Sequence, residues 1–392
     1  MNATLPTPFG HLHIVELSED PAGEMLGKFF SDMGAELTKL EPPQGACSRT
    51  VGPWRAGAQG PDESLNFWYY NTNKRSRTAD LSTPAGRAVL DGLLGEADML
   101  IVGYQPARLA ELRLDLAALQ AAHPRLIILS VTPFGLTGPW ADRRSSELVG
   151  LALGGPLHMC GYDDHSIPPI LPGGNQAYHI AAIFAHKAAM LALIEREASG
   201  EGQLVDVSMH EACAVTVELG NPYWFYSRAI VLRQTCRHAQ PVMTQPCIFE
   251  CADGRYIFLA LMLSEQKPWQ ALVEWMDSHG MAGHLTDPAF LDYSYRQERY
   301  SEVQTIVECF FLVVDAETLF QEGQARGLPV GIINAPEELL DDRHLNARNF
   351  FVEVDHGAAG RFRYPGMPYQ FSSFGPSPRL RAPKLGEHDA QG

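Results

Sequence analysis

The sequence lacks the paired cysteines that zinc sites and disulfide frameworks need. Its seven cysteines, at positions 47, 160, 213, 236, 247, 251 and 309, are odd in number and scattered, and none forms a CxxC pair. This pattern predicts no metal centre. Free thiols in this number are typical of a reduced, cytoplasmic protein.

Basic residues are also scarce. The chain has 30 Lys and Arg against 46 Asp and Glu, which gives a formal net charge of −16. A surface of this sign repels phosphate backbones, so the sequence predicts no nucleic acid partner. The same imbalance disfavours an anionic ligand unless local Lys and Arg create a positive pocket.

Long apolar runs are limited to one, from Ala177 to Ile194, where only His179, His186 and Lys187 interrupt. A helix that is apolar on nearly every face is predicted to be buried. The run is barely long enough to span a bilayer, and no second one exists, so we expect no membrane association. The N-terminal MNATLPTPFGHLHIVEL has no basic region followed by an apolar run, so no signal peptide is expected.

Strands and helices alternate through the first half of the chain. Predicted strands at 12–17, 36–41, 99–102 and 126–131 are separated by predicted helices at 24–33, 84–95 and 114–122. A strand, helix, strand unit within about 30 residues forms a right-handed crossover with parallel strands. The pattern predicts an α/β fold with a doubly wound, mostly parallel sheet.

The long helix is framed by turn signals. Pro172 to Gly174 break the chain before it, Asn175 is predicted to cap its start, and Ser199 to Gly202 turn the chain after it. Residues 203–208 then alternate like a strand with one solvated face.

The pattern changes after residue 224. Residues 247–261 predict a hairpin, followed by helices near 267–276 and 303–320 and a strand at 330–333; residues 350–374 predict short antiparallel strands. We therefore expect a large domain at 1–224, a smaller α+β domain at 225–330, and a C-terminal segment at 331–392 that returns to the large domain.

Short motifs along almost the whole chain resemble family III CoA-transferases, the carnitine and formyl-CoA transferase group. In the family's order they include IVEL (14–17), NTNKRS (71–76), FGLTGP (134–139), REASGEGQLVDVSMHEA (196–212) and LGEH (385–388). The resemblance implies the family's α/β fold, its interlocked, ring-like dimer, and coenzyme A or an acyl-CoA as substrate.

The family's catalytic aspartate is absent. In the family the long helix opens with an aspartate that attacks the acyl-CoA; aligned without gaps from residues 200–203, its place falls on Tyr178. No Asp or Glu lies between His165 and Ala192. A phenol with a pKa near ~10 would form an unactivated ester, and the amide of Asn175 is no nucleophile. The resemblance therefore implies no catalytic residue at the family position.

The racemase branch of the same family is also disfavoured. It uses a histidine and an aspartate, and their places fall on Ser146 and Tyr178. His179 and His186 share a helix face and are predicted to be core or interface histidines.

The family's CoA pocket is changed as well. The turn that commonly reads Asn-Phe-x-Pro-Gly is Gly103-Tyr104-Gln105-Pro106-Ala107 here, and Glu111 stands where an Arg meets a CoA phosphate. Arg108 is near in sequence but predicted to point elsewhere on the helix. Pro21 and Pro42 replace a polar and a basic residue of the family.

Five residues remain as candidates for CoA contacts: Lys74, Arg75, Gly103, Tyr104 and Gln105. For Lys74 and Arg75 the alternative role is structural, holding a strand-to-helix turn through backbone carbonyls.

These losses have one common explanation if the chain is the non-catalytic subunit of a two-subunit CoA-transferase, as in the succinyl-CoA:benzylsuccinate type. Its partner would then be a second family III chain that carries the aspartate, and CoA is bound by that partner alone or by both chains. Two alternatives stay open. One is an active transferase or isomerase with Glu147 or Asp163 as nucleophile, and the other is a CoA-ester-binding regulatory protein.

Overall fold

The computed structural model describes residues 6–217, 220–259 and 265–390. The chain divides into two compact units. Unit 1 comprises residues 1–157, 171–217 and 343–392, and unit 2 comprises residues 158–170 and 218–342. Each unit has its own apolar core, so each is described separately.

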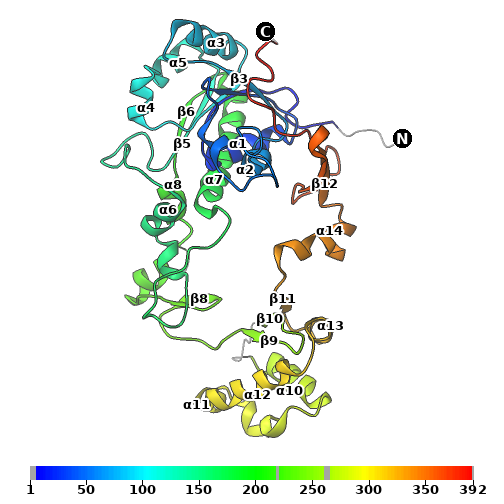
Figure 1. Ribbon diagram of the computed structural model, residues 1–392. Helices are drawn as coiled ribbons and strands as arrows, with labels where there is room; N and C mark the ends of the chain where they lie inside the picture. Colours follow the sequence, from blue (N-terminus) through cyan, green and yellow to red (C-terminus); the bar gives the residue numbers. More distant parts are fainter. Residues whose placement is uncertain (1–5, 218–219, 260–264, 391–392) are drawn as a thin grey trace. The chain divides into compact units, whose positions relative to one another are not determined.

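Unit 1 is built on a six-stranded parallel sheet with the strand order β3-β2-β1-β4-β5-β6 (Figure 1). The strands are β1 (His13–Leu17), β2 (Glu36–Glu41), β3 (Lys74–Thr78), β4 (Met99–Val102), β5 (Ile127–Thr132) and β6 (Leu204–Ser208). The predicted α/β class with a doubly wound parallel sheet is confirmed. The strand order reverses between β1 and β4, which is where ligands bind in such sheets.

Strand β3 was not predicted, because its sequence KRSRT carries no apolar residue. Lys74 and Ser76 are nevertheless buried and alternate with the more exposed Arg75 and Arg77. Buried and more exposed residues alternate along β3 as in any strand, but its buried residues are polar and are held by polar partners, so no apolar pattern marks the strand in the sequence.

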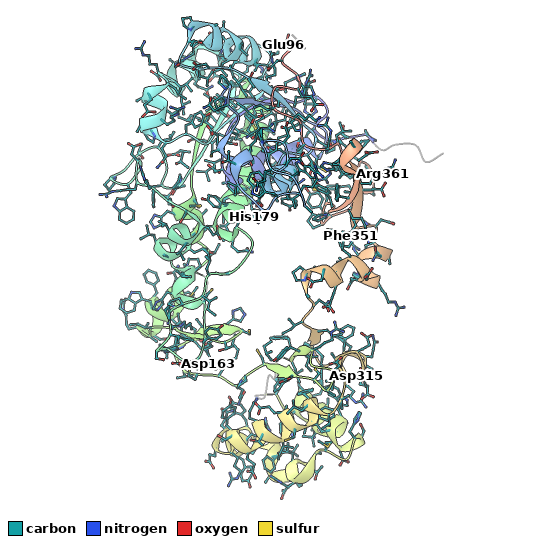
Figure 2. The ribbon with its side chains drawn as sticks, viewed as in Figure 1. Glu96, Asp163, His179, Asp315, Phe351 and Arg361 are labelled. Carbon is teal, nitrogen blue, oxygen red and sulfur yellow. The ribbon has the colours of Figure 1, made fainter. Side chains whose placement is uncertain are left out.

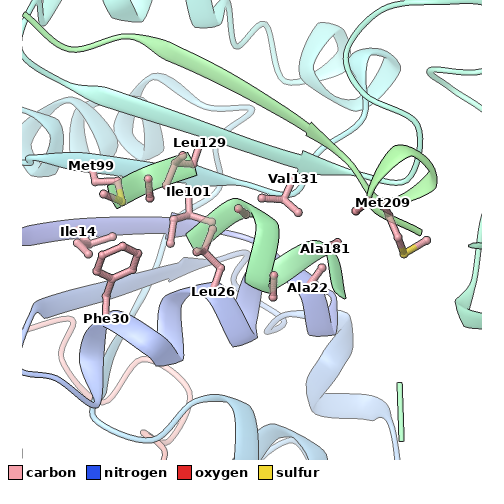
Figure 3. Packing of buried hydrophobic residues seen from close by; sticks show 14 of the residues in the cluster. Ile14, Ala22, Leu26, Phe30, Met99, Ile101, Leu129, Val131, Ala181 and Met209 are labelled. Atoms are coloured by element: carbon pink, nitrogen blue, oxygen red, sulfur yellow. The ribbon is translucent and has the colours of Figure 1, made fainter. Parts of the chain in front are cut away.

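Helices cover both faces of this sheet. On one face, α1 (Pro21–Ser31) and α7 (Gln176–Ser199) pack on β1, β4 and β5 through a cluster that includes Leu26, Ile101 and Ala181 (Figure 3). On the other face, α3 (Pro84–Leu94), α4 (Pro106–Glu111) and α5 (Leu116–Ala122) contribute Leu90, Leu109 and neighbouring leucines to a second cluster.

Helix α7 has two different faces. An alanine stripe at positions 177, 181, 185, 189 and 192 is buried, and the small side chains let the sheet and α1 approach closely. On the other side Ile183, Leu191 and Ile194 are 57%, 60% and 66% exposed. The prediction that the helix is buried all round is therefore wrong for the single chain.

By length and composition α7 could cross a membrane. Its buried alanine side belongs instead to the core of unit 1, as expected for the central helix of a water-soluble domain.

The remaining described elements of unit 1 are η1 (Cys47–Thr50), α2 (Leu65–Tyr70), α6 (Glu147–Gly154), α8 (Met209–Ala214), α14 (Arg343–Ala347), η7 (Gly357–Ala359) and the hairpin of β12 (Phe351–Asp355) and β13 (Arg361–Pro365); residues of η2 (Pro156–Met159) belong to both units. The predicted antiparallel strands of the tail are thus confirmed.

The C-terminal segment closes the free edge of β3. Ser76 N donates to Nδ1 of His388 at 3.2 Å, and Thr78 N donates to a carboxylate oxygen of Asp389 at 2.7 Å. Arg379 adds an ion pair with the buried Asp32 at 2.5 Å. Side chains thus occupy backbone groups that an exposed edge would present to other chains.

Unit 2 contains a three-stranded antiparallel sheet in the order β11-β10-β9. Its described elements are α9 (Gly220–Pro222), η3 (Tyr223–Ser227), β7 (Leu232–Gln234), β8 (Arg237–Gln240), β9 (Ile248–Glu250), β10 (Tyr256–Leu259), α10 (Gln266–Ser278), η4 (Gly283–Thr286), η5 (Pro288–Leu291), α11 (Tyr293–Glu298), α12 (Tyr300–Leu312), α13 (Ala316–Ala325), β11 (Val330–Ile332) and η6 (Pro336–Asp341). The predicted hairpin at 247–261 corresponds to β9 and β10.

The single helix predicted at 303–320 is wrong. It is two helices, α12 and α13, because the Asp315 side chain accepts a hydrogen bond from Thr318 N and starts a new helix there.

Candidate functional site

The candidate site lies at the carboxyl ends of β1 and β4, the point where the strand order reverses. The turn after β1 carries Ser18 to Asp20, and the turn after β4 carries Gly103 to Gln105. A Cβ at Gly103 would lie 3.1 Å from Cβ of Ser18 and 3.3 Å from Oδ2 of Asp20. Glycine is therefore what allows the two turns to meet.

Of the residues predicted from sequence, Gly103, Tyr104 and Gln105 come together at this point. The Tyr104 hydroxyl donates to a carboxylate oxygen of Glu19 at 3.4 Å, and burial raises its pKa well above the ordinary range. The Gln105 amide donates to the carbonyl oxygens of Ala141 and Arg143 at 2.9 and 2.8 Å. Gln105 therefore holds the loop after β5, and its amide is engaged there.

Lys74 and Arg75 lie elsewhere. Lys74 is buried, and its ammonium donates to Glu16 at 2.8 Å, to the Glu24 carbonyl at 2.8 Å and to Asn71 at 3.0 Å. These three contacts match its three donors. Arg75 pairs with Glu36, the first residue of β2. Both contacts are structural, as the alternative role for these two residues anticipates, and a CoA contact for either stays a prediction.

Below the site, Glu16, Glu24, Lys39 and Lys74 form what we call the buried network. Lys39 Nζ lies 2.9 Å from carboxylate oxygens of both Glu16 and Glu24. Burial lowers the pKa of Lys39, but the carboxylates of Glu16 and Glu24 outweigh it, and the net shift is upward. Burial raises the pKa of Glu16, and here Lys39 and Lys74 outweigh it, so that the net shift is downward. Each charge in the network has an opposite partner.

Helix α7 begins next to Tyr178, the position at which the sequence predicts the family's nucleophile. Asn175 has φ of 56° and does not cap the helix with its side chain, so that prediction is wrong. Glu147 supplies the cap instead: Ala177 N donates to both of its carboxylate oxygens at 3.0 Å, and Tyr178 N to one of them at 3.4 Å. A carboxylate at a helix N-terminus is favoured by the helix dipole.

The side chain of Asn175 serves a different contact. Its amide donates to the Tyr70 hydroxyl at 3.0 Å, and that hydroxyl lies 2.8 Å from Nε2 of His179, whose place Figure 2 labels. The phenol oxygen either accepts from both partners or donates to His179, according to the tautomer of the imidazole. Burial also lowers the pKa of His179. These hydrogen bonds hold Asn175 and the first turn of α7 against α2.

The surroundings of Tyr178 are acidic. Burial, together with the nearby Asp20, Glu147 and Cys47, raises the pKa of Tyr178 to about 12. Burial raises the pKa of Asp20 to about 6. Burial and Glu19 raise the pKa of Cys47 to about 11. We call Glu19, Asp20, Cys47, Glu147 and Tyr178 the Tyr178 crevice; at neutral pH neither its phenol nor its thiol is a nucleophile.

A hollow of about 250 Å³ lies beside this crevice, at the carboxyl ends of β2, β3 and β4. Glu19, Glu41 and Asp80 line it together with Arg108. Arg108 borders the hollow, and its guanidinium pairs with Glu111 at 3.0 Å; that it points away from a CoA phosphate stays a prediction.

The other residues singled out from sequence have structural contacts. In unit 2, both carboxylate oxygens of Asp163 accept from Arg237 at 2.9 Å, and one accepts from Thr235 N at 2.8 Å. His186 lies against Phe29 and Phe30, which confirms it as a core histidine. Ser146 starts α6. Within residues 6–217, 220–259 and 265–390, no group of three or more His, Cys, Asp or Glu side chains is placed to hold a metal ion.

The strand order and the turns at its reversal define a doubly wound α/β protein. Residues 11–389 match the model of CoA-transferase family III, and the chain belongs to that family.

Its relatives include proteins described as succinyl-CoA-dependent transferases. The chain is 32% identical to the succinyl-CoA:(R)-benzylsuccinate CoA-transferase subunit BbsE of Thauera aromatica, over 97% of this chain and 92% of that protein. It is 28% identical to succinyl-CoA–D-citramalate CoA-transferase of Chloroflexus aurantiacus, over 98% and 93%. The beta subunit of the succinyl-CoA–L-malate CoA-transferase of the same organism is 26% identical, over 99% and 94%.

Among solved structures, a CAIB/BAIF family protein from Brucella suis has a TM-score of 0.85 and 26% identity, and 98% of each chain is covered.

Proposed function

We propose that this chain is the non-catalytic subunit of a heteromeric CoA-transferase that moves CoA from a donor such as succinyl-CoA to an organic carboxylate. Tyr178 carries the proposal. The reaction needs a carboxylate that forms a reactive anhydride with the acyl group, and the family position holds a phenol whose pKa is about 12. The relatives named as subunits support a two-chain enzyme.

The charge around Tyr178 supports the same reading. Coenzyme A and succinate are both anions, whereas the crevice and its hollow present Glu19, Asp20, Asp80 and Glu147; Glu41, which also lines the hollow, is paired with Arg49 at 2.6 Å. Two like charges about 4 Å apart repel by roughly 1 kcal/mol in water and roughly 4 kcal/mol near a protein surface. Arg108, the cation that borders the hollow, is already paired with Glu111.

One observation favours an active chain as the second candidate. The Glu147 carboxylate is placed at the start of α7, close to Tyr178 N. Both of its oxygens, however, accept hydrogen bonds from α7 amides, so an attack on a thioester would cost the helix its cap. Asp163 is held in the same way by Arg237.

The exposed side of α7 supports a protein partner. Ile183, Leu191 and Ile194 form an apolar stripe on the central helix of unit 1, and α6, which packs on α7, adds the exposed Leu148 and Leu153. Exposed aliphatic side chains in this number mark protein interfaces. We assign this surface to a second family III chain that carries the catalytic aspartate.

The first experiment compares the chain alone with the chain in its complex. The purified chain alone is expected to show no CoA exchange between succinyl-CoA and a dicarboxylate acceptor such as (R)-benzylsuccinate. A tagged chain in its native cells is expected to copurify with a family III chain that has Asp at the Tyr178 position, and that complex exchanges CoA. Exchange by the chain alone would overturn the proposal.

Substitutions then locate the chemistry within the complex. Tyr178→Phe in this chain is expected to change the exchange rate less than twofold, whereas Asp→Ala in the partner abolishes exchange. Glu147→Gln and Asp163→Asn test the second candidate. A loss of exchange in either variant, with the fold and the complex intact, would favour catalysis by this chain.

The interface is tested by charge. Leu191→Glu places a carboxylate on the apolar stripe and is expected to release the partner in size-exclusion chromatography. The matched control is Val313→Glu in unit 2, a position that is 60% exposed on a different surface. Equal partner retention by both variants would exclude the α7 stripe from the interface.

A further inference from the structure

A groove of about 570 Å³ separates α3 from the strands β1, β2 and β3 in unit 1. We call it the α3 groove. Val15, Thr38 and Arg77 line it from the strands, Val89 and Leu93 from α3, and Glu96 stands beside α3 (Figure 2). It shares no lining residue with the hollow at the carboxyl ends of the strands.

The strand alternation directs Arg77 into this groove. On β3, Lys74 and Ser76 point to the buried side, where Lys74 joins the buried network, and Arg75 and Arg77 point to the α3 side. Nε of Arg77 is shielded from solvent and has no hydrogen-bond partner in the part of the chain that the structure describes. A buried guanidinium nitrogen without a partner is unusual and calls for an explanation.

The acidic residues of the groove do not supply that partner. Glu36 is bonded to Arg75 and also lies 3.8 Å from Nδ1 of His13. Glu96 is exposed to solvent. The groove thus presents an Arg fork beside the apolar wall of Val15, Val89 and Leu93.

A peptide strand does not suit this place. The free edge of β3 is already covered, because His388 and Asp389 bind the amides of Ser76 and Thr78. Strand addition needs those backbone groups.

We propose that the α3 groove binds a small carboxylate with an apolar body. The carboxylate accepts from the two terminal nitrogens of Arg77, a bidentate geometry that a guanidinium favours, and the apolar body lies along Val89 and Leu93. The volume is within the range of small-molecule sites. This site does not depend on the proposed function, since none of its residues belongs to the Tyr178 crevice.

The test titrates the purified full chain with 4-phenylbutanoate and, as a neutral match, 4-phenylbutanamide, followed by calorimetry and by ligand-observed NMR. The acid is expected to bind saturably, and the amide at least about tenfold more weakly. Arg77→Leu is expected to weaken binding of the acid at least about tenfold, and Arg77→Lys less than Arg77→Leu, because lysine keeps the charge but not the fork.

The control is Arg361→Leu on the β12–β13 hairpin, where Arg361 is exposed and pairs with Glu353 and Asp355 (Figure 2). It is expected to bind the acid like the unchanged chain. Without probe, Arg77→Leu is expected to keep or raise the thermal midpoint, because it removes a buried unpaired donor; a role in folding alone would lower it.

Three results would overturn the proposal: no saturable binding below about 10 mM, equal affinity for acid and amide, or unchanged affinity in Arg77→Leu. If Arg77→Leu does not fold, the proposal is tested by the ratio of the affinities for acid and amide and by the affinity of Arg77→Lys for the acid.

Discussion

Charged side chains gather at two neighbouring places in unit 1, and the two places are balanced differently. In the buried network, Lys39 lies 2.9 Å from the carboxylates of both Glu16 and Glu24, and Lys74 lies 2.8 Å from that of Glu16. In the Tyr178 crevice, Asp20 and Glu147 face a phenol and a thiol, and burial raises the pKa values of Asp20, Cys47 and Tyr178.

The difference shows that the ion pairs that stabilise the fold and the charges around the candidate site are arranged independently. Charges that hold strands and helix α1 together retain their partners, while the pocket above them lacks the cations that an anionic substrate needs. A family member can keep its architecture in this way after the catalytic position has changed. Three substitutions test whether the two places differ as described.

The largest effect is expected in the network. Lys74→Met removes one cation and leaves Glu16 buried with a single partner, and breaking a buried pair costs about 3–5 kcal/mol. Urea unfolding of the purified chain measures the loss. The control is Arg108→Met, which breaks the exposed pair with Glu111 and costs about 0–1 kcal/mol. Similar losses in the two variants would contradict the network's role.

An intermediate effect is expected where the crevice meets α7. Glu147→Ala removes the carboxylate that accepts from Ala177 N and Tyr178 N, and the loss of a helix cap costs about 1–2 kcal/mol. Glu147→Gln keeps an acceptor oxygen and is expected to lose less. If the alanine variant is as stable as the unchanged chain in urea, α7 does not depend on this cap.

The smallest effect has the opposite sign. Burial raises the pKa of Asp20 from its ordinary value of 3.8 to about 6, so its charge destabilises the folded chain above pH 6. Asp20→Asn keeps a capping acceptor for α1 and is expected to stabilise the chain by about 1 kcal/mol at pH 8. The gain shrinks as pH falls from 6 to 4, because Asp20 then takes up its proton in the folded state.

The network shows the reverse dependence on pH. Because the pKa of Glu16 is lowered, its contribution is complete above its ordinary value of 4.5 and is lost as pH falls further. Unfolding curves of the unchanged chain and of Asp20→Asn between pH 3 and 8 distinguish the two windows. A difference between these chains that does not vary with pH would exclude the raised pKa of Asp20.

Sequence reasoning located the elements that carry an apolar signal. The strands at 36–41 and 99–102 were predicted to the residue. Residues 99–102 are all apolar and buried, and residues 36–41 lie between turn residues. It missed β3, whose buried positions are a lysine and a serine held by partners far along the chain. It also joined α12 and α13, because the break between them depends on the cap at Asp315.

The site was predictable only in part. The replacement of the family's aspartate by Tyr178 stays a prediction from the sequence, and the turn at Gly103 is visible in it. The cap from Glu147 is not, because it joins residues 30 positions apart across two helices. The exposed stripe of α7 was misjudged for a physical reason as well: apolarity indicates burial but not whether the same chain or a partner provides it.

The cover on the β3 edge has a consequence for the synthesis of the chain. Ser76 and His388 are 312 positions apart, so the ribosome must add those residues before the edge can be closed. At about 5–20 residues per second, the nascent chain carries an open parallel edge for roughly 15–60 seconds. That interval is long compared with hydrophobic collapse, so we expect the β3 edge to be open to pairing with other chains during synthesis.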